Sequence, residues 1–134
     1  MRFDHSGYVV ADSDATINAI KPFYPEVIRY KELLAPQKAL ITLLSTQDKL
    51  HRIELVEPLP DNILLNQMLI KTDKQSVPYH ICFVTDDFDK QYKSMKQAGW
   101  TTLTRPFTAF SSEHRASHLY HPAVGIIEIM TKPL

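Results

Sequence analysis

The sequence predicts an α+β fold built from two tandem βαβββ modules. Three observations support this expectation. The chain is internally repeated, each half contains four segments rich in β-branched and aromatic residues, and each half has one short capped helical segment after its first strand. With 134 residues, the chain has the length of one ordinary domain, or of two half-size modules that share a core.

The repeat becomes visible when His5 is aligned with His80. The ten residues that begin at each histidine then match in an aromatic residue, a valine and two aspartates. The ends of the two halves also match, because Glu54 and Glu128 lie in short apolar segments that precede a proline. Glu54 follows His5 by 49 positions. Glu128 follows His80 by 48 positions. Each half therefore carries a histidine near its start and a glutamate near its end.

The first module is expected at residues 1–58. Its opening strand, at 3–10, is rich in aromatic and β-branched residues. Asp12 or Ser13 can cap the helix that follows, and Pro22 ends it. The other three strands of this module are expected at 26–33, 38–45 and 50–57.

A linker at 59–77 joins the modules. It contains an apolar helical run from Ile63 to Ile70, for which Asp61 or Asn62 is the expected cap. The second module, at 78–134, repeats the plan of the first. Its helix starts after Asp87 and ends near Gly99, where a left-handed C-cap is expected. The strands of this module are expected at 79–86, 101–106, 115–121 and 124–131.

Composition excludes several classes of function. Fifteen basic residues balance fifteen acidic ones, so no net charge favours binding to nucleic acid or to an anionic membrane. No apolar run is long enough to span a bilayer, and the N-terminus lacks the pattern of a signal peptide. The single cysteine, Cys82, cannot form an internal disulfide bond. We therefore expect a cytoplasmic protein.

The repeat indicates that the two histidines and two glutamates share one site, which none of them would indicate alone. A single strand histidine is usually packed or exposed, and a single strand glutamate usually faces solvent. Here all four residues recur at matched positions, and equivalent positions of two modules related by a pseudo-two-fold axis converge near that axis. Two carboxylates would repel one another there unless a cation lay between them. We therefore expect one divalent ion, of zinc, nickel, cobalt, manganese or iron. The expected ligands are His5, Glu54, His80 and Glu128.

Such a site predicts a class of reaction. Four protein ligands leave two positions of an octahedral ion open, so two neighbouring oxygens of one substrate could bind. A carbonyl oxygen on the ion would acidify its α-carbon and stabilise the resulting enolate. Proton transfer next to a carbonyl is the natural chemistry. The expected proton carrier is Glu128, or Glu54 if that carboxylate can leave the metal.

The segments around these residues resemble a known superfamily. They are Ile53-Glu54-Leu55-Val56-Glu57-Pro58-Leu59, Tyr79-His80-Ile81-Cys82-Phe83, and His121-Pro122 followed by Gly125-Ile126-Ile127-Glu128. Over essentially its whole length the chain resembles the vicinal oxygen chelate superfamily, which includes glyoxalase I, methylmalonyl-CoA epimerase, extradiol dioxygenases and bleomycin-resistance proteins. The resemblance implies a curled mixed sheet around a central metal cleft, and a homodimer. The four expected ligands match those of bacterial-type glyoxalase I, whereas the quoted segments look more like the acyl-CoA epimerases.

The chain departs from bacterial-type glyoxalase I at one position and from some epimerases at another. Bacterial-type glyoxalase I has an arginine implicated in glutathione recognition where this chain has Val9. Some epimerases have a carboxylate on the neighbouring strand that helps to move the proton, and Thr42 aligns with it here, within one residue. The first expectation is thus an isomerase or epimerase acting on an acyl thioester such as a branched acyl-CoA. The alternatives are a glyoxalase I-like lyase acting on a thiol hemithioacetal and a non-catalytic protein that sequesters a ligand.

Three further histidines could form a second metal cluster. On a strand, His114 and His118 share a face while His121 points the other way, and His121-Pro122 is typical of a turn at the end of a strand. We therefore expect none of the three to bind metal.

Overall fold

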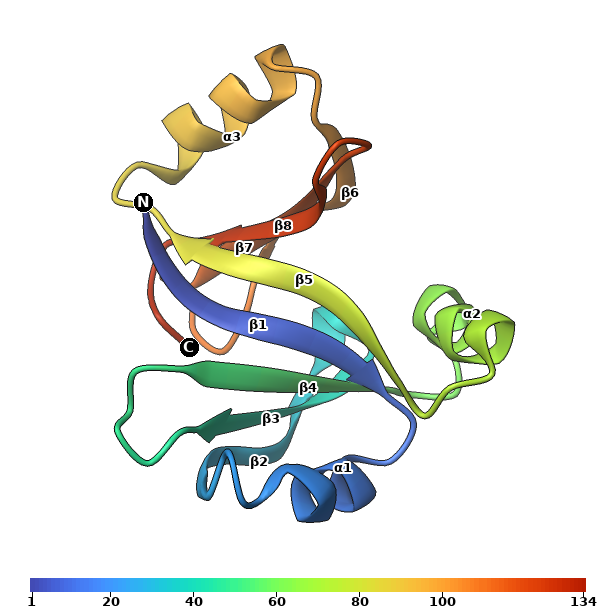
Figure 1. The fold of residues 1–134 in the computed structure, drawn as a ribbon. Helices are drawn as coiled ribbons and strands as arrows, with labels where there is room; N and C mark the ends of the chain where they lie inside the picture. Colours follow the sequence, from blue (N-terminus) through green and yellow to red (C-terminus); the bar gives the residue numbers. More distant parts are fainter. The chain divides into compact units, whose positions relative to one another are not determined.

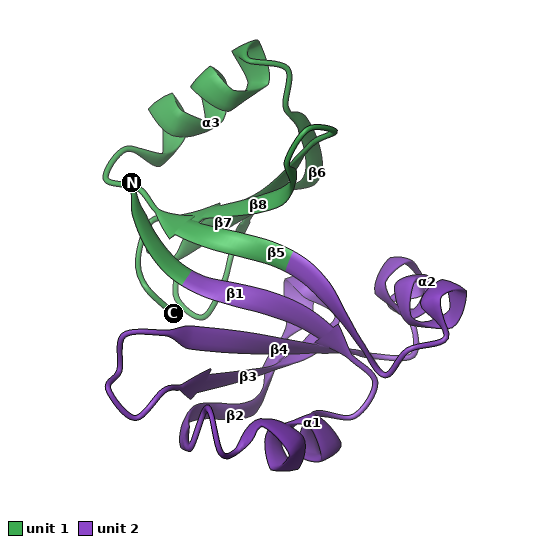
Figure 2. Cartoon of the chain, viewed as in Figure 1, with its two compact units in different colours: residues 1–4, 80–134 green, residues 5–79 purple.

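The computed structural model describes residues 1–134, and its chain divides into two compact units (Figure 2). One unit spans His5–Tyr79 and the other comprises Met1–Asp4 with His80–Leu134. The elements of the first βαβββ module and the linker are β1 (Arg2–Val10), α1 (Ser13–Ile20), β2 (Glu26–Leu34), β3 (Ala39–Ser45), β4 (Arg52–Pro58) and α2 (Ile63–Thr72). Those of the second module are β5 (Ser76–Val84), α3 (Phe88–Gln97), β6 (Thr101–Thr108), β7 (Arg115–His121) and β8 (Gly125–Met130). Figure 1 shows the chain as a ribbon with these labels. The predicted α+β class and the βαβββ order of both modules are confirmed.

The strands of the first module form a mixed sheet in the order β2-β3-β4-β1. Strands β2, β3 and β4 are antiparallel neighbours, whereas β4 runs parallel to β1. Glu54 of β4 lies between Gly7 of β1 and Leu43 of β3. A central strand is paired on both sides, so its backbone is fixed in register at the glutamate.

The strands of the second module repeat this order as β5-β8-β7-β6. Strand β8 runs parallel to β5 and antiparallel to β7. Glu128 of β8 lies between Cys82 of β5 and His118 of β7. Glu54 and Glu128 thus occupy equivalent positions in the two sheets, as the repeat in the sequence predicted.

Each helix begins at a residue that caps it. Asp12 accepts a hydrogen bond from Ala15 N, Asn62 caps α2, and Asp87 accepts from Lys90 N at the start of α3. Gly99, just after α3, has a φ of +95°, the left-handed conformation predicted for this end. None of the helices is both long and apolar enough to cross a membrane.

The helices α1 and α3 cover apolar residues of their own sheets. In the first module, residues of α1 pack on Val10, Leu44 and Leu55. In the second, Phe88 and Met95 of α3 pack with Leu119 and Ile129. Because strand residues alternate between faces, the residues that flank Glu54 and Glu128 in sequence point to these helix-covered cores. The two glutamates therefore point to the opposite face of their sheets.

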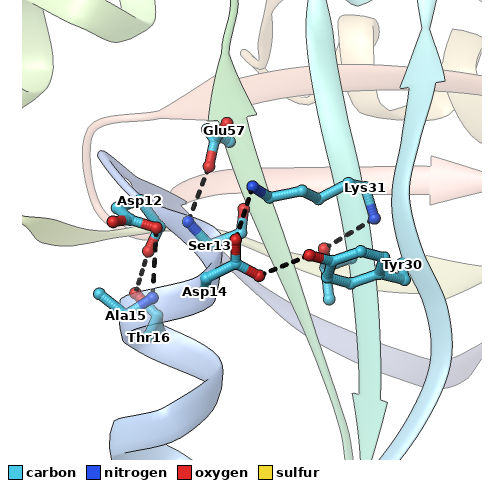
Figure 3. A network of polar contacts seen from close by, with 9 residues as sticks. Asp12, Ser13, Asp14, Ala15, Thr16, Tyr30, Lys31 and Glu57 are labelled. Carbon is cyan, nitrogen blue, oxygen red and sulfur yellow. Dashed lines mark hydrogen bonds and ion pairs between the residues drawn. The ribbon is translucent and has the colours of Figure 1, made fainter.

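A network of polar contacts joins β2 to the start of α1 (Figure 3). Asp14 accepts hydrogen bonds from the Tyr30 hydroxyl, at 2.7 Å, and from Lys31 Nζ, at 2.9 Å. Successive strand residues normally point to opposite faces. Here the strand pairing is irregular between Arg29 and Glu32, and Lys31 has a φ of 45°, so both neighbours reach the same carboxylate.

Asp14→Asn is expected to destabilise the protein slightly near neutral pH and to have less effect in acid. The Tyr30 hydroxyl and then Lys31 hold the pKa of Asp14 below its usual value. The ionised carboxylate therefore stabilises the fold above the ordinary carboxyl pKa, and this contribution is lost as the pH falls through the lowered value. Solvent screening keeps the effect small. Urea denaturation of both proteins at neutral and at acidic pH measures it.

A double-mutant cycle provides the control for this prediction. Tyr30→Phe removes the hydroxyl that Asp14 accepts from and keeps the ring. Coupled side chains give losses that do not add in the double variant. Additive losses would show that Asp14 and Tyr30 do not interact in solution.

Candidate metal centre

The first predicted ligand pair is His5 with Glu54. His5 lies on β1 and Glu54 on the neighbouring parallel strand β4. His5 Nε2 is 3.7 Å from Glu54 Oε2. Both side chains are buried; His5 is completely inaccessible to solvent and Glu54 is 5% exposed. The structure thus brings these two predicted residues together.

The second predicted pair, His80 with Glu128, repeats this arrangement. His80 lies on β5 and Glu128 on the neighbouring parallel strand β8. The distance from His80 Nε2 to Glu128 Oε1 is 3.4 Å, and both side chains are buried. A buried carboxylate requires a positive or hydrogen-bonding partner, and in each pair an imidazole is close enough to serve.

One histidine next to the second pair was missed by the sequence reasoning. His118 of β7 is buried, and its Nε2 lies 3.1 Å from Glu128 Oε2. Its ring also contacts the ring of His80, with centroids 5.0 Å apart. Sequence reasoning did not place His118 beside a predicted ligand, and its expectation that His118 does not bind metal stays a prediction. The signal that could have found it is its place on the strand next to β8, directly opposite Glu128.

Strand β3 differs from the expected epimerase pattern. Thr42 pairs with Leu55, and its hydroxyl accepts a hydrogen bond from Lys31 N at 3.1 Å. The residue opposite Glu54 is Leu43, so Thr42 points to the other face of the sheet. The segment Ala39–Ser45 has the sequence ALITLLS, which contains no carboxylate or histidine. This strand therefore supplies no acid or base beside Glu54.

The chemistry of the side chains fits a divalent ion. Each of the two pairs supplies one imidazole and one carboxylate, and all four side chains are buried. Imidazole nitrogens and carboxylate oxygens suit zinc and the neighbouring transition metals. Two carboxylates would also balance the charge of a dication, which removes much of the cost of burying either.

The chain is similar to one protein superfamily and to several solved structures. The profile of the glyoxalase/bleomycin resistance protein/dioxygenase superfamily matches residues 4–117. No curated protein matches the chain by sequence. Methylmalonyl-CoA epimerase from Mycobacterium tuberculosis has a TM-score of 0.79 at 20% identity, over 99% of this chain and 88% of that one.

Two other solved epimerases are in complex with acyl-CoA compounds. A variant of the Streptomyces coelicolor methylmalonyl-CoA epimerase, in complex with 2-nitronate-propionyl-CoA, has a TM-score of 0.76 at 26% identity, over 97% of this chain and 96% of that one. A methylmalonyl-CoA epimerase in complex with methylmalonyl-CoA and NH4+ also has a TM-score of 0.76 at 26% identity, over 96% and 92% of the chains. These similarities cover nearly all of the chain and show the fold. The family match extends over most of the sequence, and the chain therefore belongs to the glyoxalase/bleomycin resistance protein/dioxygenase superfamily.

Proposed function

We propose that this protein is a metal-dependent isomerase that moves an α-proton of an acyl thioester. The observation that carries the proposal is the pair of buried His–Glu contacts, His5 with Glu54 and His80 with Glu128, at equivalent positions of two repeated sheets. All four side chains would hold one divalent ion. A complete set of this kind is unnecessary for a protein that only sequesters a ligand, and a dioxygenase needs only two histidines and one carboxylate.

The roles of the residues follow from their chemistry. A bound divalent ion would supply Lewis acidity toward a substrate carbonyl and stabilise negative charge that develops beside it. His5 and His80 would serve only as ligands through Nε2. Glu128 would also carry the proton between the two faces of the α-carbon, with Glu54 as the second candidate. Burial keeps bulk water from competing for that proton.

Similarity to epimerases supports the thioester substrate. Two of the structural relatives that are 26% identical to this chain are epimerases in complex with acyl-CoA compounds. Val9, completely buried, stands where the bacterial-type glyoxalase has its arginine, so that contact with glutathione is absent here. We extend the proposal to a homodimer, as the family resemblance implies.

The proposal is tested by exchange of the α-proton with solvent. Zinc- or cobalt-loaded protein is incubated with methylmalonyl-CoA and other branched acyl-CoA thioesters in heavy water. We expect deuterium to enter the α-position, with loss of the α-proton signal in the proton NMR spectrum. The matched control is the protein treated with a chelator and dialysed, which should leave the signal unchanged.

Other outcomes would replace this function. The absence of exchange on every thioester, together with rapid conversion of methylglyoxal plus a thiol, would indicate a glyoxalase I-like lyase. Some epimerases use a carboxylate on this strand, whereas β3 has no acidic residue here. The glyoxalase I-like reaction is therefore tested beside the epimerase reaction. Tight binding of an unrelated aromatic compound without any turnover would indicate sequestration.

A further inference from the structure

We propose that His118 is a positioning residue that holds the carboxylate of Glu128, and that Thr104 fixes the orientation of the His118 ring. Both residues belong to the unit that contains Glu128. The inference rests on the proposed function only in the assumption that Glu128 acts in the metal centre.

The two oxygens of Glu128 face different imidazoles. Oε1 is 3.4 Å from Nε2 of His80, which is the predicted ligand nitrogen. Oε2 is 3.1 Å from Nε2 of His118. This division suits a carboxylate that presents one oxygen to a metal ion and is steadied through the other, because carboxylates that bind metals are usually contacted by a second group.

Thr104 determines which way the imidazole of His118 faces. The His118 backbone N–H donates to Thr104 Oγ1 at 2.8 Å, and the same oxygen lies 2.9 Å from His118 Nδ1. The Ser117 hydroxyl donates to the Thr104 carbonyl at 2.7 Å, which ties β6 to β7 at this point. The ring also stacks on Phe107, with centroids 5.9 Å apart. The imidazole is therefore held on several sides.

These contacts predict that Nε2 of His118 carries a hydrogen. In a neutral imidazole one nitrogen donates and the other accepts. If Nε2 were the acceptor, its lone pair would face the carboxylate oxygen of Glu128 at 3.1 Å and repel it. With Nδ1 as the acceptor, the Thr104 hydroxyl can donate to it, and the hydrogen of Nε2 lies beside Glu128 Oε2. This contact is electrostatic and lacks the geometry of a hydrogen bond. A protonated ring also carries a hydrogen on Nε2, so both charge states lead to the same arrangement.

The first module shows that the fold does not require this histidine. Leu43 is the residue opposite Glu54, at the position that His118 holds opposite Glu128. Leu43 is buried as well, so an apolar side chain fits this place in the repeated sheet. An imidazole therefore stands opposite Glu128 in the second module, and an apolar side chain stands opposite Glu54 in the first. This difference distinguishes the two otherwise equivalent glutamates.

The first test needs no metal. Nitrogen-15 NMR of the histidine rings in the metal-free protein should show a protonated Nε2 for His118. Thr104→Val removes the hydroxyl and keeps the shape of the side chain, and it should weaken this preference. A His118 Nε2 without hydrogen in the metal-free protein would overturn the inference, whatever reaction the protein catalyses.

The second test measures the consequence for metal binding. His118→Leu copies the residue of the first module and should weaken zinc affinity by ~10–100-fold, the usual effect of removing such a partner. His118→Gln, whose amide can still donate to the carboxylate, should recover part of the loss. The cobalt-loaded protein should change its visible spectrum in His118→Leu. His121→Leu, on the same strand, is the control; His121 accepts a hydrogen bond from Ala123 N and should not affect zinc affinity.

Two results would overturn the positioning role. Wild-type zinc affinity and an unchanged cobalt spectrum in His118→Leu would show that the imidazole does nothing for Glu128. Loss of the Nε2 hydrogen when zinc is added would show that His118 is itself a ligand. A wild-type protein that binds no metal would refute the proposed function, and the ring assignment in the metal-free protein would still decide the inference about His118.

Discussion

His80→Ala is expected to weaken metal binding, so that the purified variant holds less than the one divalent ion per chain expected of the wild-type protein. Whole sites of this kind bind zinc with ~10–16 kcal/mol, so one ligand of four contributes on the order of 3 kcal/mol, or roughly a hundredfold in affinity. His5→Ala should have the same effect, because His5 contacts Glu54 as His80 contacts Glu128. Elemental analysis of protein purified without chelator, and competition with a chelating dye, measure both.

The control must be a histidine away from both glutamates. His51 suits this purpose, since it is exposed just before β4 and its backbone N and O make hydrogen bonds with Thr46. His51→Ala should keep one ion per chain. Zinc should also raise the thermal midpoint of this variant and of the wild type, and not that of His80→Ala. Two ions per chain, or unchanged binding in His5→Ala, would contradict a single site with four ligands.

Much of the fold could be predicted because local signals and the repeat agree. The alternation of apolar residues placed most strands to within about three residues, and Asp12, Asn62 and Asp87 were correctly considered as helix caps. Strand β5 begins at Ser76, earlier than expected, and includes Pro78. Proline lacks a backbone donor and so obscured this start. The bulge in β2 at Lys31 also escaped prediction, because it depends on contacts with Asp14 and Thr42 that are distant in sequence.

The candidate site also has a part that the sequence could predict and a part that it could not. The four candidate ligands could be named from the sequence because they recur in the repeat, and the structure places the histidine of each module beside the glutamate of the same module. His118 could not be found by this reasoning, since Leu43 stands at the equivalent place. A repeat reveals only what the two modules share. Functional residues that differ between them become visible only when strand pairing shows which side chains are opposite each other.

Glu128→Gln is expected to lower the rate of α-proton exchange by ~10²–10⁴-fold, the usual contribution of a general base. Glutamine keeps the size of the side chain and one carbonyl oxygen, so a metal ligand is retained while the basic group is lost. Zinc affinity should therefore fall less than the rate does. The measurement is single-turnover deuterium exchange with zinc in excess, so that weaker metal binding does not reduce the observed rate.

Glu54→Gln is the matched comparison, because Glu54 holds the equivalent place in the other sheet. If Glu128 carries the proton, Glu54→Gln should retain much more of the exchange rate once zinc is saturating. The reverse order would assign the proton to Glu54. Small and equal losses would contradict a carboxylate base at either position. The contact of His118 with Oε2 favours Glu128, because it can keep this carboxylate in place during the reaction. When introduced into the wild-type protein, His118→Leu should then lower the exchange rate. When added to the Glu128→Gln variant, it should have little further effect, because a positioning residue acts only through the group that it holds.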